Sequence, residues 1–149
     1  MKYYIDCEFD GHNGALISMA IVRSFVDSLM IVALDHEASD LWVCANVLPV
    51  LHADAAGETV FCTRNAVGAN IADFIGDDKQ PTIIADSPVD IARFCAAIST
   101  SLDGTWADTP YPRMTFEVHN VECYPTRLAN AVQHNAWWDA MALREKLAA

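Results

Sequence analysis

The sequence predicts an α/β fold in which a mixed central β-sheet is flanked by helices. Three apolar segments joined by short links, at 2–9, 16–22 and 28–34, predict a three-stranded antiparallel meander. Further along, short apolar segments alternate with helical patterns, and these add two further strands to the sheet. A chain of 149 residues has the length of one domain with its own core, so residues 1–149 are expected to form a single domain.

The first half of the chain contains the meander and two helical patterns. The strand over 2–9 ends in the turn-rich sequence at 10–14, which is typical of a hairpin connection. Apolar positions in 37–51 predict an amphipathic helix, interrupted at Pro49 because proline removes a backbone donor. A second amphipathic helix is predicted over 66–75.

The second half of the chain begins with a short apolar segment at 81–85, which predicts a buried strand. Ser87 is a suitable N-cap and Pro88 suits the first position of a helix, so a helix is expected to follow, continuing through Ile98. The remaining predicted elements are a loop over 103–113, a fifth strand over 114–118 and two helices over 126–133 and 137–147.

The composition is that of a folded, acidic protein. Hydrophobic residues make up 53% and charged residues 19% of the chain, which argues against disorder. The formal net charge of −11 counts against an extended basic surface for nucleic acid. It leaves open a nuclease that engages a few nucleotides through metal ions.

Cysteine usage and the N-terminal sequence indicate the compartment. The five cysteines are scattered, odd in number and form no CxxC pair, which favours reduced thiols over disulfides or a zinc site. No apolar run is long enough to span a bilayer, so no membrane partner is expected. The first strand begins directly after Met1, which predicts the absence of a signal peptide and a cytoplasmic protein.

Two carboxylates stand in the first predicted strand, at Asp6 and Glu8. Because side chains alternate along a strand, both point to one face and Cys7 points to the other. Two like charges side by side repel and are costly to desolvate, so this arrangement favours a bound cation between them.

Three further residues could complete such a site. Asp90 falls in the first turn of the helix expected after Ser87, where sites in α/β sheets gather; Ser87-x-x-Asp90 also resembles a capping box, a purely structural alternative. His134 and Asp139 would lie ~140° apart on one continuous helix. They converge only if the last helix begins at Asn135, acting as N-cap.

In this order along the chain, Asp6-x-Glu8, Asp90 and His134-x4-Asp139 resemble the site of the DEDDh family of 3′→5′ exonucleases. The order of these residues and the His-x4-Asp ending both match the family. The resemblance spans nearly the whole chain and implies an RNase H-like fold.

Two local motifs carry the resemblance. The segment 85–91 resembles the middle motif of the family, with Asp86 where asparagine is usual. The segment 134–140, His-Asn-Ala-x-x-Asp-Ala, is close to the third motif. The short length and the stretch from Trp42 to Pro49 are most similar to the small bacterial and phage exoribonucleases of the family.

The resemblance implies a mechanism with two Mg²⁺ or Mn²⁺ ions, which oxygen ligands suit better than zinc. Asp6, Glu8 and Asp139 would hold the first ion. Asp6 would bridge to the second ion, on which Asp90 would act directly or through water. His134 would be the general base that takes the proton of the attacking water.

The implied substrate is a single-stranded or short RNA 3′ end, and the product a nucleoside 5′-monophosphate. Phe9 and Leu16 occupy positions that line the terminal-base pocket in related enzymes. Trp137 and Trp138 could stack on bases, although core packing is the better interpretation for at least one of them. Homodimers are common among relatives, which makes a homodimer one expectation here.

Three other functions stay open on the sequence. The first is a DNA exonuclease of the same family, because discrimination would depend on a contact to the 2′-hydroxyl. The second is a non-catalytic RNase H-like module that binds nucleic acid, which would be expected to lack one or more of the five site residues. The third is a nucleotide phosphohydrolase that uses the same metal pair.

Overall fold

The computed structural model describes residues 1–35, 37–53, 55–107, 113–122 and 124–148. Its strands are β1 (Lys2–Phe9), β2 (Leu16–Val22), β3 (Ser28–Ala33), β4 (Glu58–Cys62), β5 (Thr82–Ala85) and β6 (Thr115–Val118). Its α-helices are α1 (Leu41–Asn46), α2 (Val67–Ile75), α3 (Pro88–Ile98) and α4 (Ala136–Ala148). Three short 3-10 helices complete the description: η1 (Leu48–Val50), η2 (Arg64–Ala66) and η3 (Pro125–Arg127).

The strands form one mixed sheet in the order β4-β3-β2-β1-β5-β6. β1, β2 and β3 pair antiparallel, so the predicted meander is confirmed. β5 lies parallel to β1, and β6 lies parallel to β5. On the opposite edge β4 lies parallel to β3, so three strands join the meander rather than the two predicted.

β4 is the strand that the sequence pattern missed. Its residues Glu58 and Thr59 are exposed, as is the side chain of Phe61. Only Val60 and Cys62 are half-buried against the core, and an apolar residue occupies the exposed position Phe61, so the sequence shows no clear alternation of apolar and polar residues.

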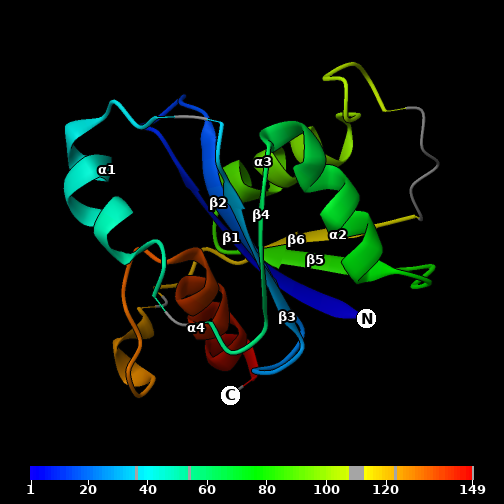
Figure 1. Cartoon of the computed structure of the whole chain (residues 1–149). Coiled ribbons are helices and arrows are strands. Elements are labelled where there is room, and N and C mark those ends of the chain that lie inside the picture. The colour runs from blue at the N-terminus through cyan, green and yellow to red at the C-terminus, as the bar shows by residue number, and fades with distance from the viewer. Residues whose placement is uncertain (36, 54, 108–112, 123, 149) are drawn as a thin grey trace.

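Helices cover both faces of the sheet. Tyr3 and Ile5 of β1 belong to a buried cluster that includes residues of α2 and α3. Ala20 and Val22 of β2 belong to a second cluster, formed with Trp137 of α4. Figure 1 shows α4 against one face, with α2 and α3 together on the other. β2 and β3 are buried throughout because both of their faces are covered.

The helix predicted over 37–51 is shorter in the structure. It begins at Leu41 because the Asp40 carboxylate accepts hydrogen bonds from the backbone N–H groups of Trp42 (2.9 Å) and Val43 (3.1 Å). It ends at Asn46, and Pro49 lies in η1 beyond. The interruption predicted at the proline therefore becomes a change from α-helix to 3-10 helix.

The helix predicted over 126–133 is wrong. Only η3 forms there, because Leu128 returns to extended backbone and Asn130 has a φ of 65°. The apolar residues that suggested helical periodicity, Leu128 and Val132, instead pack against the cluster around α4. This segment is held by tertiary packing rather than by helical hydrogen bonds.

The starts of α3 and α4 follow the predicted caps. The Ser87 hydroxyl accepts a hydrogen bond from the backbone N–H of Val89 (3.1 Å), with Pro88 at the first helical position. The Asn135 side-chain oxygen accepts from the backbone N–H of Trp138 (3.3 Å), so Asn135 caps α4. The predicted strand over 114–118 is β6, and residues 108–112 of the predicted loop before it lie outside the described residues.

The described cysteines and helices bear on two further predictions, the free thiols and the lack of a membrane span. Cys7, Cys44, Cys62 and Cys95 are free thiols, and Cys123 lies outside the described residues. Among the described helices, none combines the length and apolar character needed to cross a bilayer.

Candidate metal centre

The acidic pair of β1 lies at the carboxyl end of the strand, under the start of α4. Asp6 and Glu8 line the same pocket as Asp139 of α4. Cys7, between them, is buried in the core on the opposite face. The thiol of Cys7 donates to the backbone carbonyl of Asp90 (3.9 Å), which ties β1 to the first turn of α3. The predicted alternation of β1 is therefore confirmed.

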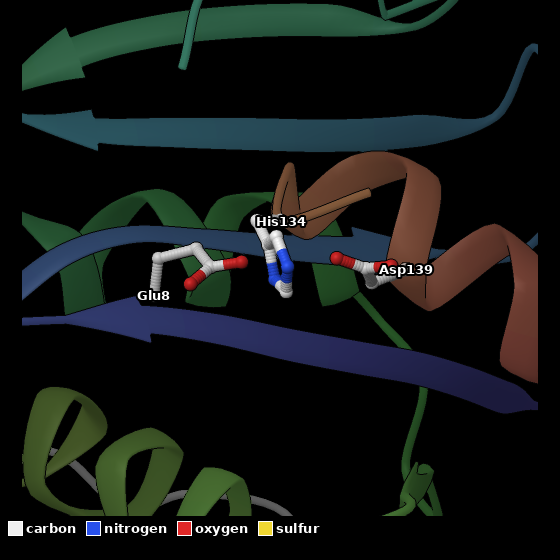
Figure 2. Close-up of side chains that lie close together, drawn as sticks. All are labelled: Glu8, His134 and Asp139. Atoms are coloured by element: carbon white, nitrogen blue, oxygen red, sulfur yellow. The ribbon is translucent and has the colours of Figure 1, made fainter. Parts of the chain in front are cut away.

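Two groups of potential ligands form at this end of the sheet. Glu8, His134 and Asp139 make one group, in which one ligand atom from each residue lies within 4.8 Å of the others. Figure 2 shows the His134 imidazole between the carboxylates of Glu8 and Asp139.

The second group contains three carboxylates. One oxygen each from Asp6, Asp86 and Asp90 satisfies the same 4.8 Å limit. Asp86 follows β5, which lies parallel to β1, so the carboxyl ends of both strands meet at one edge. Asp90 is only 4% exposed in the first turn of α3. All five residues expected at the site are thus brought to one place.

His134 reaches the site because of an unusual backbone conformation. Its φ of 64° is left-handed, which is uncommon for a residue with a side chain. The chain therefore turns sharply before Asn135 caps α4. His134 therefore lies in the loop before the helix, and Asp139 lies in the first turn of α4. This is the arrangement predicted for a last helix capped by Asn135.

The carboxylates raise one another's pKa values. Burial is the main cause for Asp6, whose pKa lies well above its usual range, and the charges of Asp90 and Asp139 raise it further. Burial, followed by the charges of Asp139 and Asp90, raises the pKa of Glu8 to about 8. Desolvation and like charges both disfavour the ionised form.

Asp90 and Asp139 behave in the same way. Burial raises the pKa of Asp90 to about 7, helped by the charge of Asp86 and opposed by hydrogen bonds from Cys7. Burial also raises the pKa of Asp139 to about 7, opposed by hydrogen bonds from the backbone amides of His134 and Asn135. The raised pKa values mean that these carboxyl groups hold their protons near neutral pH. A divalent cation would take the place of those protons and balance the negative charge.

The pocket above the two groups has a volume of about 300 Å³. Phe9 lines it, and the contact of Phe9 with a substrate stays a prediction. Leu16 is 9% exposed, belongs to the core cluster and lies outside the pocket lining. Its apolar side chain packs in the core with residues of α2 and α3, and its contact with a substrate stays a prediction.

Asp86, which the sequence identified only as the replacement for an expected asparagine, also lines the pocket. Tyr124 and Gln133 line it as well and were not predicted. Ser18 pairs with Glu8 across β1 and β2, and its buried hydroxyl makes no hydrogen bond within the described ranges. Asp86 and Ser18 carried a signal, namely a polar residue directly after a buried strand or within one. Tyr124 and Gln133 carried none, because they come from irregular segments.

A second pocket of about 360 Å³ adjoins the first and shares Cys7, Glu8 and Phe9 with it. Its lining also includes Trp42 of α1. The guanidinium of Arg93 lies 4.8 Å from the centre of the Phe9 ring, a cation–π contact at the border of the two pockets.

Trp137 and Trp138 belong to the core. Both are buried, and the indole N–H of Trp137 donates to the Ser28 hydroxyl (2.7 Å). Core packing therefore holds for both residues, and neither indole is available to stack on a base.

The donor set fits a hard divalent cation. Five carboxylates and one imidazole converge, and carboxylate oxygen is the ligand that Mg²⁺ and Mn²⁺ prefer. Among known proteins, neither a family model nor a curated sequence matches the chain.

Proposed function

We propose that this chain is a metal-dependent 3′→5′ exoribonuclease of the DEDDh type with an RNase H-like fold. It would hydrolyse phosphodiester bonds at single-stranded or short 3′ ends and release nucleoside 5′-monophosphates. The observation that carries the proposal is the meeting of two ligand groups, Glu8–His134–Asp139 and Asp6–Asp86–Asp90, in one open pocket. Such a double group suits two-metal phosphodiester chemistry.

The carboxylates would hold Mg²⁺ or Mn²⁺ at two positions. Glu8 and Asp139 would serve one position, and Asp6, Asp86 and Asp90 would serve the other. When bound, the ions would lower the pKa of a water molecule and stabilise negative charge on the phosphate oxygens.

His134 is assigned the role of general base. The imidazole projects between Glu8 and Asp139 and lines the open pocket, so it is within reach of a water molecule at that position. Imidazole can accept a proton near neutral pH, which suits this role.

The surroundings of the site favour a small substrate. Phe9 offers an apolar ring at the pocket wall, and the guanidinium of Arg93 lies 4.8 Å from the centre of that ring. With a net charge of −11 the molecule has no general attraction for a long polyanion. The metal ions and a few local contacts would therefore provide most of the affinity.

The decisive experiment incubates the protein with a 5′-labelled single-stranded RNA and with a DNA of matched sequence. Each is tested with Mg²⁺, with Mn²⁺ and with EDTA. We expect stepwise shortening of the RNA from its 3′ end, with nucleoside 5′-monophosphate as product, only when metal is present.

The Asp139→Asn variant is the matched control, since it keeps the size of the side chain and removes the charge. It should fold and leave the RNA intact. A folded wild-type protein that shortens neither polymer in either metal would overturn the proposal. Faster shortening of the DNA than of the RNA would identify a 3′→5′ DNA exonuclease instead. RNA binding without cleavage would identify a non-catalytic binding module.

A further inference from the structure

We propose that Trp42 is the positioning residue of His134: its indole fixes the orientation of the imidazole in the site. This inference rests on the proposed function for its consequence in catalysis, but the contact itself can be tested without activity. The ring centroids of Trp42 and His134 lie 4.9 Å apart with an interplanar angle of 79°, an edge-to-face pair. Such a geometry is attractive between aromatic rings and restricts rotation of both.

The imidazole needs an external restraint. In the ranges that the structure describes, no hydrogen bond is made to either ring nitrogen of His134. Its backbone also has a left-handed φ of 64°. Such a conformation is costly for a residue with a side chain and persists only where the surroundings hold it. Packing against Trp42 supplies that restraint on the ring.

Trp42 is itself held by a firmly anchored helix. Asp10, two residues beyond Glu8, accepts hydrogen bonds from the backbone N–H of Ser39 (2.9 Å) and of Asp40 (2.8 Å). Asp40 in turn caps α1 at Trp42 and Val43. Val43 is buried against Ile17 of β2. The position of the indole is thus set by the same sheet that carries the acidic pair.

A second contact joins the same segment to the turn that carries His134. The side-chain amide of Asn135 donates to the backbone carbonyl of Val50 (2.9 Å), in η1. Asn135 is 1% exposed, and the hydrogen bond itself is part-buried. The α1–η1 segment therefore holds His134 by its ring through Trp42 and by its backbone through Asn135.

The exposure of Trp42 raises an alternative role. The side chain is 54% exposed and lines the second pocket with Phe9. A nucleobase stacked on the indole would lower KM, whereas a positioned general base raises kcat. The two roles therefore predict different kinetic changes when Trp42 is replaced.

The first test measures the imidazole proton resonances of His134 by NMR in the metal-free protein, assigned with the His134→Asn variant. An indole at this distance exerts a ring-current shift on those protons. We expect Trp42→Leu to move them and Trp42→Phe to restore them in part. Leu41→Ala, at an 86% exposed neighbour on the same helix, is the matched control and should leave them unchanged. Unmoved His134 resonances in a folded Trp42→Leu protein would overturn the proposal.

The second test compares kcat and KM for RNA with a normal or an abasic 3′-terminal residue. We expect Trp42→Leu to lower kcat about tenfold on both substrates, with Trp42→Phe closer to wild type, because misplacing a general base forfeits part of its effect. A defect confined to KM that vanishes on the abasic substrate would assign Trp42 to base stacking alone and refute positioning. If the wild-type protein has no nuclease activity, the proposed function fails while the NMR test still decides the contact.

Discussion

At the scale of single residues, the site gathers more negative charge than the folded protein can hold ionised. Asp6, Glu8, Asp90 and Asp139 all have raised pKa values, with burial as the largest cause of each. A fold keeps such a cluster only at a cost in stability, which is a common property of functional sites. Two predictions follow from individual side chains.

The first concerns Asp6, the residue whose pKa is raised by every other carboxylate of the cluster. Asp6→Asn removes a buried charge without changing the size of the side chain. We expect the metal-free variant to melt about 2–4 °C higher than wild type at pH 8, equivalent to about 1 kcal/mol for a chain of this size. The measurement is thermal unfolding in EDTA.

The same variant should lose most of the rise in melting temperature that Mn²⁺ gives the wild-type protein. Leu41→Ala, on the exposed face of α1, serves as the control for a neutral substitution. An Asp6→Asn protein that is less stable in EDTA and still fully stabilised by Mn²⁺ would contradict the reading of the cluster as a cation site.

The second concerns His134, which is replaced best by asparagine because asparagine tolerates a left-handed φ. If His134 is the general base, His134→Asn should lower kcat about 10²- to 10⁴-fold. Mn²⁺ affinity, measured by calorimetry, should stay close to that of the wild type. Loss of Mn²⁺ binding in the folded variant would show that the imidazole serves chiefly as a ligand.

At the scale of elements, helix caps and strand ends position the side chains of the site. The capped starts of α3 and α4 direct side chains into the candidate metal pocket, whereas the β1–β2 connection and the cap of α1 line the second pocket beside it. The register of β1 against β2 shifts between Glu8 and Phe9. An irregularity of this kind re-aims side chains at the end of a strand, and here it lies where Phe9 enters the pocket wall.

Gly14 makes the β1–β2 connection possible. A Cβ atom at this position would lie 1.5 Å from the backbone oxygen of Asp10, so only glycine allows this approach. We expect Gly14→Ala to destabilise the protein by at least about 2 kcal/mol, because the backbone itself must move. Urea unfolding would measure this, with Asn13→Ala in the same turn as control. A Gly14→Ala protein as stable as the control would contradict the tight packing of the turn.

At the scale of the whole molecule, we expect the site to make stability depend on pH and on bound metal. In the unfolded chain these carboxyl groups ionise near their ordinary pKa values of about 4. In the folded chain the pKa values of Asp90 and Asp139 are about 7, and that of Glu8 is about 8. Between these limits the folded state binds more protons than the unfolded state, so the free energy of unfolding falls as pH rises.

We therefore expect the metal-free protein to be more stable at pH 5 than at pH 8, as measured by urea unfolding in EDTA. Mn²⁺ should stabilise the protein far more at pH 8 than at pH 5, since protons compete for the same oxygens. Asp139→Asn should show a weaker pH dependence than wild type. A metal-free protein whose stability rises steadily from pH 5 to pH 8 would show that the cluster does not dominate this range.

Prediction from the sequence succeeded where the signal is local. The alternation of β1 put Asp6 and Glu8 on one face, and the caps at Ser87 and Asn135 located the starts of α3 and α4. Each of these depends on residues a few positions apart, whose geometry follows from backbone rules. The meander was predictable for the same reason, since its links are short.

Contacts between distant segments decided the rest. The edge strand β4, the loss of the helix over 126–133, the burial of Leu16 and the inclusion of Asp86 all depend on which surfaces meet in the folded chain. Trp42 and His134 face each other although 91 intervening residues separate them. The sequence by itself thus determined which side chains could bind a cation and on which elements they lie. Only the tertiary structure decided which of them meet, because long-range packing selects partners that local rules do not specify.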